Sequence, residues 1–201
     1  AVGNTDVPFI EALEQPLDAY VVECTSFRLA WSEMFRADAA VWLNLAPDHL
    51  NWHRDMSSYE AAKAKIFAQQ HRSDTAIGGS HDPIVMTDLQ AAPSRQITFG
   101  FEGDYHFSNG VLMSPRGPII STSEMTRSLP HDITNALAAA ALVMESGLVG
   151  VQSVAAALRE FVAPVHRLQF VAEVNGVRWF NDSKATTPHA ASAAIRAFPT
   201  S

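Results

Sequence analysis

The sequence predicts an α/β fold in which a mostly parallel sheet is flanked by helices. Two short runs rich in valine, leucine and aromatic residues, Ala19–Glu23 and Ala39–Leu45, end in polar residues, as buried strands of a parallel sheet do. Alanine-rich stretches of helical length occur later in the chain. In such folds ligands bind beyond the carboxyl ends of the strands, so the polar residues after each strand are candidates for a site.

The middle of the chain continues with a helix and further strands. From Ser57 to Gln70 the pattern is helical, with Ser57 or Ser58 available as the N-cap and apolar residues recurring on one side. Gln96–Phe99 is the next predicted strand, and a glycine-punctuated β stretch follows it as far as Ser121. These elements extend the predicted sheet.

Two helices follow the β stretch. His131–Ser146 is predicted to be a tightly packed, alanine-rich helix that ends at Gly147, and Val151–Phe161 is a second helix of similar character. Ala163-Pro164 then breaks the helical pattern. We therefore expect a domain boundary near Pro164, which divides the chain into residues 1–163 and 164–201.

The part of the chain after Pro164 begins with a predicted β-hairpin. Gln169–Val174 and Val177–Phe180 flank Asn175-Gly176, a dipeptide that is strongly favoured in type I′ turns. A helix is expected to start near Pro188.

The composition is that of a globular protein without a disulfide framework. The chain has 201 residues, of which 47% are hydrophobic and 17% charged, and a single cysteine, Cys24. Its longest apolar run, Ala136–Met144, is well short of the roughly 20 residues that span a bilayer. The formal net charge of -7, with basic residues scattered singly, argues against nucleic-acid binding. We expect a cytoplasmic monomer with no nucleic-acid partner and no membrane insertion.

The loop 181–187, with the sequence NDSKATT, is the most informative polar stretch. It places an acid, a lysine and several hydroxyl groups directly after the apolar strand that ends at Phe180. This arrangement suits a loop that holds a charged ligand, because a phosphate in an acidic protein needs locally placed cations. The alternative is an ordinary polar turn that caps the helix starting near Pro188.

Three upstream segments and this loop together carry a resemblance to a known family. The segments are Val21–Phe27, Asn44–His53 and Tyr59–Phe67, with the sequences VVECTSF, NLAPDHLNWH and YEAAKAKIF. In that order, over essentially the whole chain, they resemble the Mur ligases, the ATP-dependent amide-forming enzymes of peptidoglycan precursor synthesis. The sequence of the loop is similar to that of the loop in the branch of the family that adds D-glutamate to UDP-N-acetylmuramoyl-L-alanine. The resemblance implies most of a central ATPase domain in residues 1–163 and the start of a Rossmann-like C-terminal domain in residues 164–201.

The resemblance implies that magnesium serves the ATP chemistry. Glu23 would hold the ion shared with the β and γ phosphates, and His49 and Lys63 would serve a second ion, with Asp48 orienting His49. Lys63 would first be carbamylated by carbon dioxide, which requires a desolvated lysine with a lowered pKa. From the residues alone, each has an ordinary alternative: a solvent-facing acid at a strand end, a core or capping histidine, and a helical lysine that extends into solvent. The core alternative also applies to His53.

The resemblance also assigns contacts to the nucleotide and the substrates. Adenine, the γ-phosphate and the ribose would be contacted by Asn135, Arg167 and Asp182, respectively. Lys184 would stabilise the acyl-phosphate intermediate and so act, with His49 and Lys63, in catalysis. The residues expected to contact the muramyl substrate or the incoming D-glutamate are Asn4, Thr25, Ser26 and Thr186.

Some parts of the family pattern are missing or altered. The Gly-rich phosphate loop expected before Asn4 does not occur, so we expect an internal fragment that is inactive alone. The family commonly has other residues at five further positions, which are Arg28, Asn51, Asp132, Gln169 and Thr187.

Two other functions stay open from the sequence. One is a sister ligase, such as a folylpolyglutamate synthase or a Mur ligase that adds another amino acid. The other is a non-catalytic nucleotide-binding module that keeps the fold without the phosphate loop.

Overall fold

The computed structural model describes residues 1–4, 7–14 and 16–198. Its main feature is a six-stranded sheet in which the strands are adjacent in chain order. The first four strands pair in parallel and the last three form an antiparallel meander. The mostly parallel α/β sheet predicted from the sequence is thus confirmed. The strands are β3 (Ala39–Trp42), β4 (Thr75–Gly79), β5 (Arg95–Gly100), β6 (Tyr105–Ser108), β7 (Val111–Ser114) and β8 (Gly117–Ser121).

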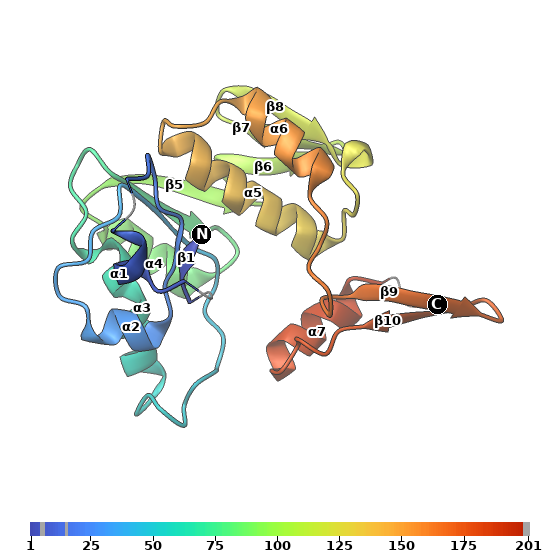
Figure 1. Ribbon diagram of the computed structural model, residues 1–201, viewed down its shortest axis with the longest axis horizontal. Helices are drawn as coiled ribbons and strands as arrows, with labels where there is room; N and C mark the ends of the chain where they lie inside the picture. The colour runs from blue at the N-terminus through green and yellow to red at the C-terminus, as the bar shows by residue number, and fades with distance from the viewer. Residues whose placement is uncertain (5–6, 15, 199–201) are drawn as a thin grey trace.

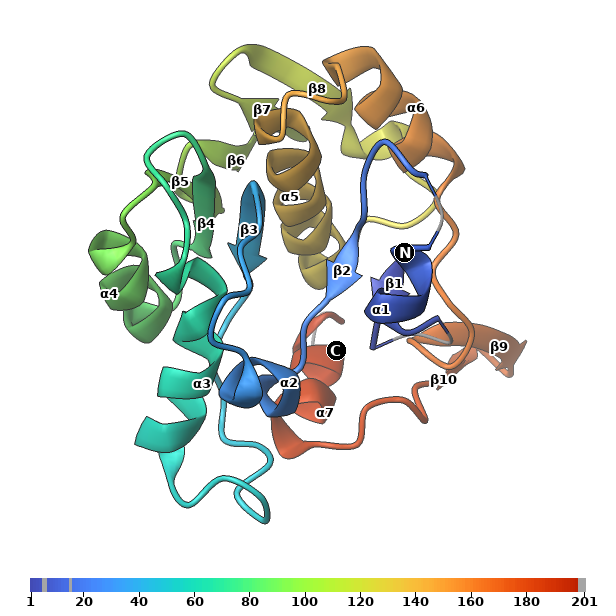
Figure 2. The same cartoon turned by 60° about the vertical axis from the view of Figure 1, so that its left-hand side comes forward.

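Helices cover both faces of this sheet (Figure 2). On one face lies α5 (Pro130–Glu145), whose alanines let it pack closely on Ile77, Phe99 and Leu112 of the strands. The helix α6 (Val151–Glu160) packs beside it. Burial of these apolar side chains is the main stabilising contribution to the fold.

The opposite face packs on α3 (Met56–Ala68) and α4 (Pro83–Ala91). Ala40 and Trp42 of β3 share one face of the sheet, because alternate strand residues point to opposite faces. They pack in one cluster with Phe67 and Leu89 of these helices. The neighbours of Ala40 and Trp42 therefore face α5, and the sheet is buried on both sides, as parallel sheets are.

Beside the main sheet lies a pair of short parallel strands, β1 (Val2–Gly3) and β2 (Val22–Glu23). The helices α1 (Phe9–Ala12) and α2 (Ser26–Trp31) follow these strands. Gly3 has φ of +101°, and a Cβ there would come within 2.5 Å of the Glu23 carbonyl oxygen. Glycine is therefore required for the two strands to approach.

The C-terminal segment consists of β9 (Gln169–Val174), β10 (Val177–Asn181) and α7 (Pro188–Arg196). Asn175 and Gly176 both have positive φ, 52° and 78°, which confirms the predicted type I′ hairpin. Figure 1 shows this segment projecting away from the six-stranded sheet. A domain boundary near Pro164 remains a prediction, and residues 199–201 of the predicted second domain lie outside the described residues.

Several predicted boundaries shift. The predicted strands Ala19–Glu23 and Ala39–Leu45 shorten to β2 and β3. The prediction of Ser57 or Ser58 as the N-cap of α3 is wrong. Asp55 is the cap, because its carboxylate accepts from the Ser58 amide while the Ser58 hydroxyl accepts from the Asp55 amide. The strand β4 and the helix α4 were not predicted, because the sequence around them lacks a clear period.

Candidate functional site

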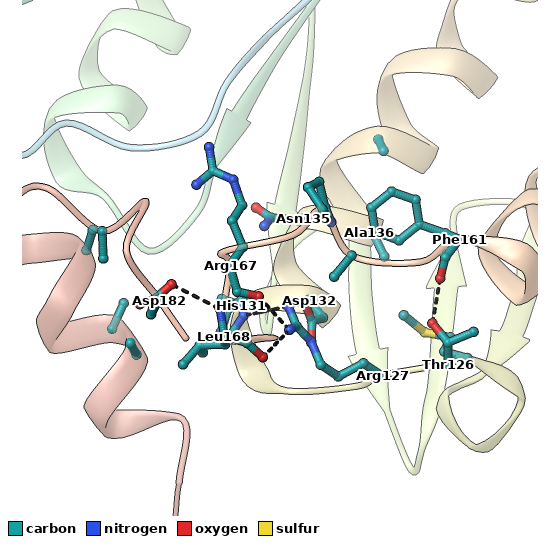
Figure 3. A pocket seen from close by; sticks show the side chains of 18 of the residues that line it. Thr126, Arg127, His131, Asp132, Asn135, Ala136, Phe161, Arg167, Leu168 and Asp182 are labelled. Carbon is teal, nitrogen blue, oxygen red and sulfur yellow. Dashed lines mark hydrogen bonds and ion pairs between the residues drawn. The ribbon is translucent and has the colours of Figure 1, made fainter. Parts of the chain in front are cut away.

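The N-terminal half of α5 and the C-terminal segment enclose a cavity of about 410 Å³ (Figure 3). Its walls include the three residues expected to contact nucleotide, Asn135, Arg167 and Asp182. They come from three separate parts of the chain. The volume lies within the range of small-molecule sites, about 300–1,000 Å³.

One wall of the cavity is a stripe along α5. His131, Asn135 and Ala139 recur every four residues and therefore lie on one side of the helix. The buried residues of the helix, such as Ile133 and Leu137, lie on the other side. Alanines of α7, Ala190, Ala193 and Ala194, add an apolar wall. Apolar walls with a few polar groups are typical of small-molecule sites.

Arg167 lies in a tight turn between α6 and β9. Its neighbours His166 and Leu168 have positive φ, 66° and 46°, which side chains other than glycine rarely adopt. The Leu168 amide donates to the Asp182 carboxylate at 3.0 Å, and the Lys184 amide donates to the His166 carbonyl at 3.2 Å. The loop after β10 thereby holds the turn that carries Arg167.

Arg127 is a cavity residue that sequence reasoning missed. Its guanidinium donates to both Asp132 oxygens at 2.7 Å and to the carbonyl oxygens of Arg167 and Leu168 at 2.8 and 3.0 Å. A lone arginine after a β stretch gave no signal. The one clue in the sequence was Asp132, a carboxylate at a position where the resemblance implies an amide. The structure shows that this carboxylate is largely buried, and a buried carboxylate requires a partner.

The loop 181–187 forms the cap expected of an ordinary polar turn, and its role as a ligand-holding loop stays a prediction. Asn181 accepts from the Ser183 amide at 3.1 Å, and Thr187 caps α7 by accepting from the Ala190 amide at 3.3 Å. The expectation of a helix cap is confirmed. Lys184 and Thr186 are exposed, so their side chains are accessible to a ligand. Their assigned contacts to phosphate and D-glutamate stay predictions.

Glu23 ends β2 beside Asn4. The Asn4 amide group donates to the Glu23 carboxylate at 3.1 Å, and the Asn4 backbone amide donates to the Glu23 carbonyl at 3.0 Å. The structure therefore brings together two predicted site residues, one assigned to magnesium and one to substrate. The Glu23 side chain is exposed.

Lys63 and His49 form a second group around Tyr59. The Lys63 ammonium lies 5.5 Å from the centre of the Tyr59 ring, and the His49 ring centre lies 6.1 Å from it. Burial lowers the pKa of Lys63, and the nearby Asp48 carboxylate acts in the opposite direction but more weakly. The helical lysine is therefore desolvated, and the alternative of a lysine extending freely into solvent does not apply.

His49 has a constrained backbone and a carboxylate neighbour. Its φ is 55°, and its amide donates to Asp48 at 2.7 Å. The His49 Nε2 atom lies 3.5 Å from an Asp48 oxygen, so the two side chains lie side by side, and the orienting role expected of Asp48 in a magnesium site stays a prediction. The ring also packs against Phe27, with centres 4.8 Å apart. These contacts set the orientation of the imidazole.

Local hydrogen bonds hold the start of α2 and link it to His53. They involve Thr25 and Ser26. The Thr25 hydroxyl caps α2 by accepting from the Arg28 amide at 3.3 Å. Ser26 is buried, and its hydroxyl lies 2.9 Å from the His53 ring. His53 is buried as well, as expected for a core histidine, and burial followed by the charges of His49 and Lys63 lowers its pKa. The substrate contacts assigned to Thr25 and Ser26 stay predictions.

Within the described residues, no three His, Cys, Asp or Glu side chains cluster closely enough to hold a metal ion. The expected ligand set differs from such a cluster, because it includes Lys63 and the phosphates of a nucleotide. The same part of the chain has no helix whose length and hydrophobicity would suit a membrane span.

Comparison with known proteins decides the family. Residues 8–143 match the Mur ligase middle domain. The chain belongs to the Mur ligase family. This match covers the main sheet with most of α5, and it ends before the C-terminal segment that closes the cavity.

Curated Mur ligase relatives match nearly the whole chain. The UDP-N-acetylmuramoylalanine--D-glutamate ligase of Frankia casuarinae is 38% identical over 98% of the chain, and that of Pelotomaculum thermopropionicum is 36% identical over 98%. The chain spans 44% and 45% of these proteins, which is less than half of their length.

A solved Mur ligase structure has the same fold. The MurF ligase of Thermotoga maritima, solved in complex with ADP, aligns with a TM-score of 0.69 over 98% of this chain and 49% of its own. The sequence identity is 16%, so this likeness concerns the fold alone.

Proposed function

We propose that this chain is the nucleotide-handling part of an ATP-dependent ligase that adds D-glutamate to UDP-N-acetylmuramoyl-L-alanine. The observation that carries the proposal is that Asn135, Arg167 and Asp182 line one cavity. The family resemblance in the sequence assigns these residues to adenine, the γ-phosphate and the ribose. Contacts to one ligand require such residues to converge, whereas surface residues with unrelated roles have no reason to do so.

In the proposed reaction the L-alanyl carboxylate attacks the γ-phosphorus of ATP, and the bond from that phosphorus to the ADP oxygen breaks. The D-glutamate nitrogen then attacks the acyl carbon, phosphate leaves, and the nitrogen loses a proton to solvent or a basic group. Arg167 would orient the γ-phosphate through its planar donors, and the accessible Lys184 would neutralise charge on the acyl phosphate. Both roles need positioned cations rather than covalent help from the protein.

The desolvation of Lys63 supports its carbamylation. A neutral lysine nitrogen would attack the carbon of carbon dioxide, one C=O electron pair would move to oxygen, and the nitrogen would release a proton to solvent. The lowered pKa raises the neutral fraction that can react. Glu23, His49 and the carbamate would then hold Mg²⁺, since oxygen donors suit this ion and imidazole is tolerated beside them. The ion would supply positive charge against the phosphates.

Two observations support D-glutamate as the amino acid. The curated relatives named above are D-glutamate ligases by name. The loop 182–186 keeps Lys184 and Thr186 exposed beside the cavity wall formed by Asp182 and Ala185. As part of this proposal we expect a cytoplasmic, monomeric protein. Its partners would be small-molecule substrates and not nucleic acid or membrane.

A sister ligase with another amino acid is the second candidate. The structural likeness to a MurF ligase leaves this candidate open, because at 16% identity it concerns the fold alone. The amino acid cannot be read from a fold shared by the whole family.

The test is phosphate release by the complete protein that contains these residues. The assay would include ATP, Mg²⁺ and UDP-N-acetylmuramoyl-L-alanine, with D-glutamate, L-glutamate, L-lysine or L-alanine as the amino acid. We expect release that depends on D-glutamate, and no release from the 201-residue chain alone. Release with a different amino acid would favour the sister ligase, and no release with any would favour a non-catalytic nucleotide-binding module.

A further inference from the structure

The guanidinium of Arg127 donates hydrogen bonds to other protein groups from both of its edges. One edge, formed by Nε and one terminal nitrogen, donates to the two oxygens of Asp132. The other terminal nitrogen donates to the carbonyls of Arg167 and Leu168. The side chains of Arg127 and Asp132 are 25% and 12% exposed, so this ion pair is partly shielded from water. Bidentate, charge-assisted bonds of this kind have a fixed geometry as well as strength.

The Asp132 end of this contact is anchored to α5. Asp132 is the third residue of the helix, and its carboxylate also accepts from the Leu129 amide at 3.0 Å. Asn135 lies one turn further along the same helix and faces the cavity. Any group held by the Arg127–Asp132 pair is therefore positioned relative to Asn135.

The other end of the contact is the turn that carries Arg167. His166 and Leu168 have left-handed backbone conformations, which persist only where the surroundings hold them. From the C-terminal side, Asp182 holds the Leu168 amide. From the α5 side, Arg127 holds the carbonyls of residues 167 and 168. In Figure 3 the Arg167 side chain leaves this turn on the same side as the Asn135 amide.

We propose that Arg127 is a positioning residue for the nucleotide site and acts through Arg167. By clamping the backbone of residues 167–168 to α5, it fixes the distance between the Arg167 guanidinium and the Asn135 amide across the cavity. The charge of Arg127 is already paired with Asp132, so its contribution to phosphate binding comes through the Arg167 backbone. This inference rests on the proposed function, because it supposes that the cavity binds ATP.

The experiment is a double-mutant cycle in the complete protein, with calorimetry measuring the affinity for AMP-PNP, an ATP analogue that keeps the γ-phosphate and is not hydrolysed. Arg127→Met is expected to weaken AMP-PNP binding about tenfold, and Asp132→Asn, which keeps one acceptor oxygen, about threefold. In an Arg167→Met background, Arg127→Met should produce little further loss, because the group it positions is absent. Arg159→Met is the matched control. It removes an exposed arginine paired with Glu124 outside the cavity, and it should leave AMP-PNP affinity unchanged.

The outcomes separate the two proposals. If the unmutated protein does not bind AMP-PNP, the proposed function fails and the role of Arg127 fails with it. If the unmutated protein binds AMP-PNP but Arg127→Met binds it equally well, or if the losses from Arg127→Met and Arg167→Met simply add, the positioning role is wrong while the proposed function stands. If Arg127→Met does not fold, Arg127→Lys replaces it. Lysine keeps the charge but cannot serve the carboxylate and both carbonyls together, so the same loss and the same non-additivity are expected.

Discussion

The cavity beside α5 and the Lys63 group are built in different ways. The cavity is lined by segments far apart in sequence, and hydrogen bonds that Arg127 donates and Asp182 accepts hold its walls together. The Lys63 group lies within residues 27–63 and is held by aromatic packing around Tyr59 and Phe27. We propose that the cavity positions a nucleotide, whereas in the Lys63 group burial lowers the pKa of a lysine. The two regions should therefore respond differently to mutation.

The largest expected effect is on the Lys63 group. Lys63→Met in the complete protein should lower kcat on the order of a hundredfold or more, the loss typical of removing one electrostatic stabiliser. ADP affinity should change little, because Lys63 does not line the cavity. Steady-state kinetics and calorimetry measure the two quantities. Lys65→Met is the matched control. Lys65 lies on the same helix but donates to the Ala30 and Ser32 carbonyls, so its loss should lower the Tm and leave kcat near that of the unmutated protein.

The next largest effect is expected for Arg167, which lines the cavity. Arg167→Met should raise the KM for ATP roughly 10- to 100-fold, since a hydrogen bond to a charged group contributes about 1.5–3 kcal/mol. Arg159→Met should leave the KM unchanged. An equal fall of kcat in Lys63→Met and Arg167→Met, with no change in nucleotide affinity in either, would remove the distinction between the two regions.

The proposed carbamylation would make the Lys63 group depend on carbon dioxide and pH. Because the pKa of Lys63 is lowered, its neutral fraction at a given pH exceeds that of an exposed lysine, and this fraction grows as the pH rises towards the pKa. Activity should fall several-fold in buffers stripped of carbon dioxide and return on addition of bicarbonate. ADP affinity should be insensitive to both treatments. Activity that does not change in stripped buffer would count against the carbamate.

The smallest expected effect concerns His53. Its folded-state pKa is lowered by burial and by His49 and Lys63, so below the ordinary histidine pKa the unfolded chain binds more protons than the folded one. Stability should therefore decrease as the pH falls from about 6.5 towards the folded pKa. His53→Asn should flatten the dependence of Tm on pH between about 5 and 7, with a change on the order of a few degrees. An unchanged pH profile would mean that another group is responsible.

Much of the fold followed from local patterns. The alanine-rich α5, the hairpin at Asn175-Gly176 and the strand β5 were predictable because their signals lie within a few neighbouring residues. The strand β4 was missed because it is buried on both faces and includes Gly78 and Gly79, so it shows no alternation. The cap of α3 was misplaced because serine and aspartate are similar candidates in sequence, and the hydrogen bonds of the folded backbone choose between them.

The sequence by itself determined the family and the candidate residues, because the residues of a motif and their spacing are properties of the chain alone. Only the tertiary structure decided which candidates meet. It placed Asn135, Arg167 and Asp182 around one cavity, joined Asn4 to Glu23, and gave Lys63 a desolvated position. It also revealed Arg127, whose partners are an aspartate five residues away and two carbonyls about 40 residues away. Burial and hydrogen bonding to distant backbone depend on how the chain closes on itself, and no local pattern records them.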